Sequence, residues 1–148
     1  MKKTLGIMVL VFLWTVTSAL AAETPIGKWK TIDDETNKEI SVIEIYEQDG
    51  ALYGRIVELL QEPDGGKGKL CDKCTGNDYN KPIVGMVILK GLKASGNEFS
   101  GGTIMDPGNG KTYKCKIEVL EEGAKLKVRV FVGFSLLGRN QYWLRVQQ

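Results

Sequence analysis

The stretch that decides the fold is residues 111–131, KTYKCKIEVLEEGAKLKVRVF. From Tyr113 to Val119 the odd-numbered residues are apolar and the even-numbered ones charged, whereas from Leu126 to Val130 the even-numbered residues are apolar. Because the side chains of a strand point alternately to its two faces, this pattern predicts two strands, each with one buried and one solvated face. Glu121-Glu122-Gly123 predicts the turn between them, so the two strands are expected to belong to a meander.

The same pattern of strands separated by turn residues extends along most of the chain. Asp49-Gly50 is a strong hairpin signal because both central residues of a type I′ turn need positive φ. Ala94–Asn97 and Asp106–Gly110 are rich in residues that favour turns. The run from Pro82 to Leu89 is apolar without a period, which fits a buried strand or a short helix, and we interpret it as a strand. The predicted strands are Ile26–Thr31, Ile40–Tyr46, Ala51–Leu60, Pro82–Leu89, Glu98–Met105, Lys111–Leu120, Lys125–Phe134 and Gln141–Val146.

About eight strands and no long amphipathic helix predict an all-β fold, either a barrel or a sandwich. We expect a single antiparallel up-and-down β-barrel, because closure removes exposed strand edges. The 148 residues, 43% hydrophobic and 26% charged, suit one globular domain.

Charge and composition exclude several classes of function. Lys plus Arg is 20 and Asp plus Glu is 18, and without Lys2 and Lys3 the two totals are equal at 18. A neutral mature chain has no net field that would recruit nucleic acid or an anionic membrane. The chain has no His, which excludes a Ser-His-Asp triad, a Cys-His pair and most zinc and haem sites. No cofactor is expected.

The N-terminal segment has the three parts of a secretory signal peptide. Lys2-Lys3 is basic, Leu5–Trp14 is uncharged and mostly apolar, and Ala19-Leu20-Ala21 is a small-x-small cleavage site. A membrane anchor is the alternative, but the uncharged stretch is only marginally long enough and becomes polar before its alanines. We therefore expect a signal peptide over 1–21 and a barrel domain over 22–148. The mature chain is expected to be exported without a membrane span, periplasmic if the source is Gram-negative and otherwise secreted.

Gly27-Lys28-Trp29 resembles the Gly-x-Trp signature of lipocalins and related calycin barrels. The resemblance implies that Trp29 closes one end of the barrel, beside Gly27, and that an Arg from the last strand packs on its ring. Arg145 is well placed for this contact, and Arg139 is the competitor. An Arg plane on an indole face is a favourable cation–π contact.

Most of the mature chain resembles one family of small exported bacterial proteins, catalogued as domain of unknown function 2147. The resemblance implies a lipocalin-like barrel and export, and it implies no catalytic or binding residue. The matching runs are Gly54–Val57, Pro82–Gly91, Gly101–Tyr113 and Val132–Trp143.

The three cysteines predict a local cross-link. Cys71 and Cys74 lie in the longest predicted loop, and Cys115 lies on the apolar face of a predicted strand. In an exported protein we expect Cys71 and Cys74 to form a disulfide and Cys115 to be a buried thiol. A bond from Cys115 to either loop cysteine is the alternative. A redox site is disfavoured because Thr75–Asp78 is typical of a turn, and metal is not expected because four ligands are lacking.

An eight-stranded barrel has room for its own side chains or for one small ligand. We expect a protein without enzyme activity that binds a small, mostly apolar molecule in the cell envelope. Arg55 and Arg129 would meet an anionic head group if their side chains pointed inward. The expected lining residues are Ile43, Ile45, Arg55, Ile104, Tyr113, Val128 and Val130.

Two other classes of function stay open. In the first, a filled barrel without ligand presents the Cys71–Cys74 loop or Leu136-Leu137 to another envelope protein. In the second, an enzyme uses the carboxylates of Glu44 and Glu58 or the loop thiols.

Overall fold

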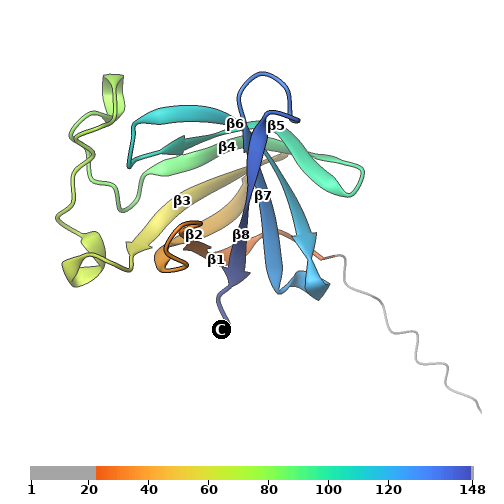
Figure 1. Ribbon diagram of the computed structural model, residues 1–148, viewed down its shortest axis with the longest axis horizontal. Helices are drawn as coiled ribbons and strands as arrows, with labels where there is room; N and C mark the ends of the chain where they lie inside the picture. The colour runs from red at the N-terminus through yellow and green to blue at the C-terminus, as the bar shows by residue number, and fades with distance from the viewer. Residues whose placement is uncertain (1–22, 148) are drawn as a thin grey trace, which may run out of the picture.

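The predicted barrel is confirmed by a computed structural model, which describes residues 23–147. Eight antiparallel strands close into one barrel in which each strand pairs with its sequence neighbours and β8 pairs with β1 (Figure 1). The predicted signal peptide, 1–21, lies outside the described residues. The strands are β1 (Gly27–Ile32), β2 (Glu39–Gln48), β3 (Ala51–Leu59), β4 (Val87–Ser95), β5 (Glu98–Asp106), β6 (Lys111–Leu120), β7 (Lys125–Phe131) and β8 (Gly138–Arg145).

The β6–β7 hairpin shows how alternation builds the wall of the barrel. Ile117 pairs with Val128 and Cys115 with Val130, and all four side chains are buried. The charged residues between them face outward, as their parity predicts. The connecting 3₁₀ turn η3 (Glu121–Gly123) has positive φ at all three of its residues.

The strand predicted over Pro82–Leu89 is wrong in its first half, because β4 begins at Val87 and continues to Ser95. The backbone turns back on itself before β4, where the Met86 amide donates to the Ile83 carbonyl oxygen at 3.1 Å. Gly85 permits this turn with a φ of +93°. Ile83 and Met86 are nevertheless buried, so the run is apolar because it packs against the core and not because it forms a strand. Two other boundaries differ by three residues: β7 ends at Phe131 and β8 begins at Gly138.

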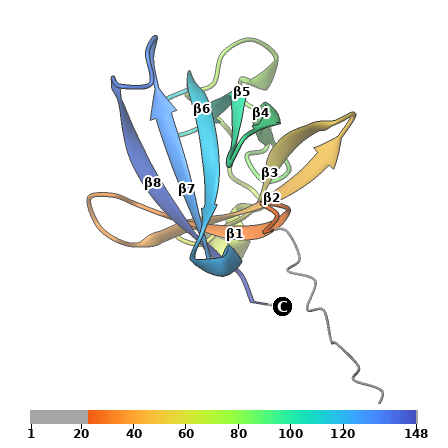
Figure 2. The ribbon, with the colours of Figure 1, turned by 90° about the vertical axis from the view of Figure 1, so that its right-hand side faces the viewer.

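The direction of the strands determines at which end of the barrel each loop lies. Because consecutive strands are antiparallel, the β1–β2, β3–β4, β5–β6 and β7–β8 loops all lie at one end, which we call the open end. The longest of them, residues 60–86, holds the 3₁₀ turns η1 (Pro63–Gly66) and η2 (Gly76–Asp78). The part of the long loop around η2 and the β7–β8 loop project at the top of Figure 2.

The opposite, closed end is built around Trp29, which is fully buried. The Trp29 indole nitrogen donates to the Pro25 carbonyl oxygen at 2.8 Å, and the Arg145 guanidinium carbon lies 4.1 Å from the centre of its ring. Arg145 also donates to the carbonyl oxygens of Thr24, Ile26 and Gly123. The guanidinium group therefore ties the chain before β1 and the β6–β7 turn to the last strand.

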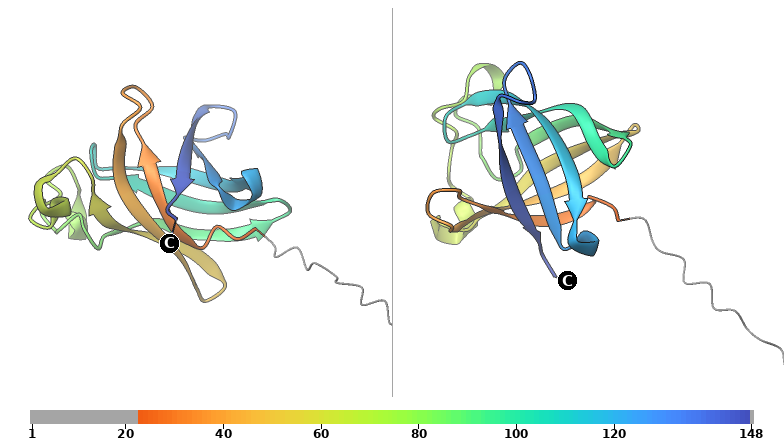
Figure 3. Two further views of the ribbon diagram at one scale, coloured as in Figure 1. Left: turned by 90° about the horizontal axis from the view of Figure 1, so that it is seen from below. Right: turned by 45° about the vertical axis from the view of Figure 1, so that its right-hand side comes forward.

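Two details complete the closed end. A Cβ added to Gly27 would lie 2.8 Å from the Arg145 Nη1 atom, so a side chain there would crowd the guanidinium group. Arg139, the competitor, lies at the open end with its Nη1 atom 3.6 Å from the Asp34 carboxylate. The seam between β1 and β8 is short, since its register includes only Trp29↔Arg145 and Lys30↔Leu144 (Figure 3).

Candidate functional site

A cavity of about 660 Å³ occupies the open half of the barrel. Its buried wall is apolar, and its edge is formed by residues from the β1–β2, β3–β4 and β5–β6 connections together with the start of β8. The half nearer Trp29 is filled by side chains that do not line the cavity, Leu52, Leu89, Leu92 and Leu126 among them. The barrel is therefore hollow at one end and packed at the other. The buried apolar wall consists of Ile43, Ile56, Ile83, Ile88, Ile104, Met105, Val130 and Trp143.

Of the seven residues expected to line the barrel, six have side chains inside it and Arg55 does not. Ile43, Ile104, Tyr113 and Val130 line the cavity. Ile45 and Val128 are buried inside the barrel but belong to its packed half.

The prediction that Arg55 lines the interior is wrong, because its side chain lies on the outer face. Gly54 and Ile56 are buried, and alternation turns the residue between them outward. There Arg55 donates to a Glu44 carboxylate oxygen at 2.6 Å, and its guanidinium carbon lies 5.7 Å from the centre of the Tyr46 ring. Arg129 is also outside, where it donates to the Ser135 carbonyl oxygen at 2.6 Å.

The cavity also has lining residues that the sequence patterns do not predict as such. Alternation along β3 contained the signal for Ile56, whereas Ile88 was hidden in an apolar run without a period. Nothing in the sequence pattern pointed to Thr31 and Ser41, whose two buried hydroxyl oxygens lie 2.7 Å apart at the cavity.

The polar side chains that reach the inner cavity are uncharged. Besides Thr31 and Ser41, they include Gln141, whose amide oxygen lies 3.4 Å from the Trp143 indole nitrogen that donates to it. The Tyr113 hydroxyl accepts a hydrogen bond from the Asn109 amide at 3.0 Å. Every buried side-chain nitrogen and oxygen within 23–147 has a hydrogen-bond partner. The inner surface therefore suits an apolar molecule with a few neutral polar groups.

Charged groups are confined to the edge of the cavity, where several of them are held by ion pairs or hydrogen bonds. Lys69 donates to a Glu62 carboxylate oxygen at 2.7 Å, and this contact raises the pKa of Lys69. The Asp33 carboxylate accepts hydrogen bonds from the Thr36 amide and hydroxyl at 2.6 and 2.8 Å, which lowers the pKa of Asp33. The edge residues with charge are Asp33, Asp34, Glu35, Glu62, Lys69, Asp72, Lys73, Asp106 and Arg139.

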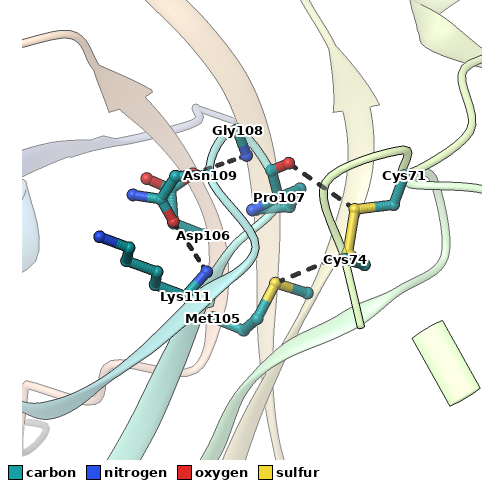
Figure 4. Close-up of a disulfide and its surroundings, with 8 residues drawn as sticks. All are labelled: Cys71, Cys74, Met105, Asp106, Pro107, Gly108, Asn109 and Lys111. Atoms are coloured by element: carbon teal, nitrogen blue, oxygen red, sulfur yellow. Dashed lines mark hydrogen bonds between the residues drawn. A yellow bond between two sulfur atoms is a disulfide. The ribbon is translucent and has the colours of Figure 1, made fainter. Parts of the chain in front are cut away.

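The predicted Cys71–Cys74 disulfide is formed, and both residues are buried. The bridge packs against the β5–β6 turn: the Cys71 sulfur lies 3.6 Å from the Pro107 carbonyl oxygen, and the Cys74 sulfur lies 3.9 Å from the Met105 sulfur (Figure 4). A disulfide sulfur carries no proton, so these are packing contacts. The bridge thus fixes the long loop beside the opening of the cavity.

The Asp106–Gly110 turn packs closely against that loop. The Asp106 carboxylate accepts from the Gly108 amide, and the Asn109 side-chain oxygen accepts from the Lys111 amide, both at 2.8 Å. Gly110 has a φ of +74°, and a Cβ added to it would lie 1.8 Å from the Lys73 carbonyl oxygen. Turn chemistry and close packing therefore account for this motif.

The third cysteine, Cys115, is a free thiol inside the barrel, and burial raises its pKa to about 12. In the unfolded chain the thiol ionises near pH 9, so above that pH the unfolded state releases a proton that the folded state keeps. The stabilising contribution of the neutral thiol is complete below pH 9 and declines as the pH rises towards 12.

We expect the folding equilibrium of the wild type to lose about a factor of ten per pH unit in this window relative to Cys115→Ala. Urea denaturation of both proteins across the pH range measures the difference. Parallel stability curves for the two proteins would contradict the assignment.

The carboxylates considered for catalysis do not meet in the cavity. Glu44 pairs with Arg55 on the outer face, and Glu58 is exposed on β3. In the part of the chain that the structure describes, no three Cys, Asp or Glu residues are grouped so as to hold a metal ion. Within the same residues, no helix has the length and apolar character needed to cross a membrane.

Comparisons with known proteins agree with this architecture. Residues 27–145 match the family model described as "Uncharacterized protein conserved in bacteria (DUF2147)". The comparison with curated proteins found no match. Among solved structures, the chain is similar to protein HP1028 from the human pathogen Helicobacter pylori, described as belonging to the lipocalin family, with a TM-score of 0.72 and 22% identity over 82% of each chain. The chain therefore belongs to the DUF2147 family of bacterial proteins, and its fold is a lipocalin-like barrel.

Proposed function

We propose that this protein is an exported binding protein, without enzyme activity, that takes up one small and mostly apolar molecule at the open end of its barrel. The observation that carries the proposal is the cavity of about 660 Å³ with a buried apolar wall. Sites for small molecules typically have about 300–1,000 Å³, an apolar lining and a few polar groups that fix orientation. The signal-peptide pattern of 1–21 supports export, to the periplasm if the source is Gram-negative.

The arrangement of polar groups favours a ligand whose apolar part enters first. The inner wall offers only neutral partners, such as the Thr31 and Ser41 hydroxyls and the Gln141 amide. A charged head group buried there would lack a counter-ion, which is costly in an apolar site. The polar part of the ligand would instead stay at the charged edge, in contact with water.

Filling the cavity should abolish uptake without disturbing the barrel. Val130 lines the cavity, and in Val130→Trp the larger side chain would occupy open space. Val132→Trp makes the same change at a residue that is exposed and does not line the cavity. We expect Val130→Trp to weaken binding of the neutral dye N-phenyl-1-naphthylamine at least tenfold, and Val132→Trp to bind it as the wild type does.

Fluorescence titration of the three proteins measures this difference, and native mass spectrometry with denaturing extraction identifies any molecule that copurifies. Equal dye binding by the two variants would place the dye outside the cavity. If the wild type neither bound the dye nor copurified with a small molecule, the binding proposal would fail. The interaction module without a ligand would then be the better description.

A further inference from the structure

The connection between β7 and β8, residues 132–137, exposes an unusual amount of apolar surface. Val132 is 66% exposed, Phe134 76%, Leu136 89% and Leu137 71%. We call this segment the apolar loop; it projects beyond the ends of its strands (Figures 1 and 2). Single exposed apolar residues are ordinary, but a contiguous exposed cluster usually marks a contact surface.

The exposure follows from how the loop backbone is held. The Leu137 amide donates to the Phe134 carbonyl oxygen at 3.0 Å, which closes a turn at the tip. Arg129 donates to the Ser135 carbonyl oxygen at 2.6 Å, and Lys114 donates to the Gly133 carbonyl oxygen at 3.4 Å. Two cationic side chains of the outer wall thus support the loop from below while its apolar side chains point into solvent.

These two cations differ from three neighbouring basic residues on β6 and β7. Lys116, Lys125 and Lys127 each pair with a glutamate, at 3.1, 2.8 and 3.6 Å. Lys114 and Arg129 have no carboxylate within ion-pair distance among residues 23–147. Although the charges balance over the mature chain, positive charge without a counter-ion lies at the base of the apolar loop.

Arg139 adds a third cation near the same loop. It follows Gly138, the first residue of β8, and its side chain is 63% exposed. Its Nη1 atom lies 3.6 Å from the Asp34 carboxylate, the same distance as in the Lys127–Glu118 pair, and its charge also acts on Asp33. The charge of Arg139 is therefore balanced by acidic residues at the cavity edge, so the cations without a counter-ion near the loop are Lys114 and Arg129.

We propose that the apolar loop docks the protein on the surface of a lipid bilayer that contains anionic phospholipids. Phe134, Leu136 and Leu137 enter the boundary between head groups and acyl chains. Lys114 and Arg129 face the phosphates, because cations beside inserted apolar groups favour anionic lipid. A protein partner fits less well, since one short loop falls far below the roughly 20–30 residues a side of a stable protein interface.

The docking surface lies at the open end of the barrel, where the cavity also opens. A bilayer bound there would lie beside the opening. The proposal does not depend on ligand binding, because the loop residues 132–137 are not part of the cavity lining.

Vesicle sedimentation of the exported form of the protein tests the proposal. We expect binding to vesicles of mixed phosphatidylglycerol and phosphatidylcholine, a loss of at least tenfold in Leu136→Ser/Leu137→Ser, and no change in Leu144→Ser. Leu144 is a matched control because it is an exposed leucine on β8, outside the loop. Lys114→Gln should weaken binding several-fold on the mixed vesicles, whereas Lys127→Gln, on the same wall, should not.

Lipid composition and salt distinguish the electrostatic contribution to vesicle binding from the apolar contribution. On pure phosphatidylcholine the Lys114→Gln effect should vanish, and added salt should weaken binding only where phosphatidylglycerol is present. The substituted side chains are exposed, except Lys127, which is half-buried and makes only a weak surface ion pair, so all variants should keep the thermal midpoint of the wild type.

Wild-type binding to neither kind of vesicle, or equal binding by Leu136→Ser/Leu137→Ser, would overturn the proposal. Light scattering without lipid measures the oligomeric state of the protein as a further test. If it showed a wild-type dimer that this double variant dissociates, the loop would serve a second copy of the chain and the membrane assignment would be wrong.

Discussion

In Trp29→Ala the free energy of unfolding is expected to fall by about 3–5 kcal/mol, the usual range for removing a large buried aromatic side chain. Trp29 is fully buried, and its indole nitrogen donates to the Pro25 carbonyl oxygen. The substitution also removes the ring on which Arg145 packs. Urea denaturation followed by circular dichroism measures the loss.

Two further variants serve as references for the stability loss in Trp29→Ala. Tyr142→Ala removes an aromatic residue from the outer face and should cost no more than about 1 kcal/mol, as for other surface substitutions. Trp29→Phe keeps a ring under Arg145 but loses the indole hydrogen bond, so its stability should lie between those of the wild type and Trp29→Ala. If Trp29→Ala were as stable as Tyr142→Ala, the closed end would not depend on this side chain.

Gly110→Ala is the second substitution expected to have a large effect, with a loss of about 3 kcal/mol or more. A left-handed backbone costs a residue with a Cβ about 1–2 kcal/mol, and here the φ is +74°. In addition, the new methyl group would lie 1.8 Å from the Lys73 carbonyl oxygen, so the disulfide loop would have to move away from the β5–β6 turn. For a domain of this size the thermal midpoint should fall by roughly 10 °C.

Gly108→Ala is the matched control, since it places the same methyl group in the same turn. There the nearest atom is a side-chain oxygen of Asp106 at 3.1 Å, which can adjust, and the backbone does not have the left-handed φ of Gly110. We expect a change of less than about 1 kcal/mol. Thermal unfolding curves for the two variants that coincide would refute the close packing of the loop on the turn.

The fold was predictable where local chemistry and tertiary environment agree. Alternation along β6 and β7 predicted which side chains are buried, and Asp49-Gly50 marked the β2–β3 hairpin. The disulfide followed from the short spacing of Cys71 and Cys74 in a chain that begins with a signal-peptide pattern. In each of these cases neighbours in the sequence determine the outcome.

The candidate site was harder to predict because it depends on what meets across the barrel. Arg55 was assigned to the interior because its parity was ambiguous; the buried Gly54 and Ile56 on either side of it resolve the ambiguity. Pro82–Met86 resembles a strand in composition, but its backbone turns back on itself at the end of the long loop. The cavity itself depends on the side-chain volumes of distant strands, so no local pattern could show that only one half of the barrel is hollow.

The narrow seam between β1 and β8 has a consequence for the order of folding. Arg145 on the last strand donates to the carbonyl oxygen of Ile26, 119 residues earlier. Hairpins such as β6–β7 can form from local sequence, but contacts this distant require a large loss of chain entropy before they stabilise anything. The barrel can therefore close only after the C-terminal strand has been synthesised and released. Until then the edge of β1 that faces β8 is unpaired. The amides of this edge should be the last to gain protection from hydrogen exchange during refolding.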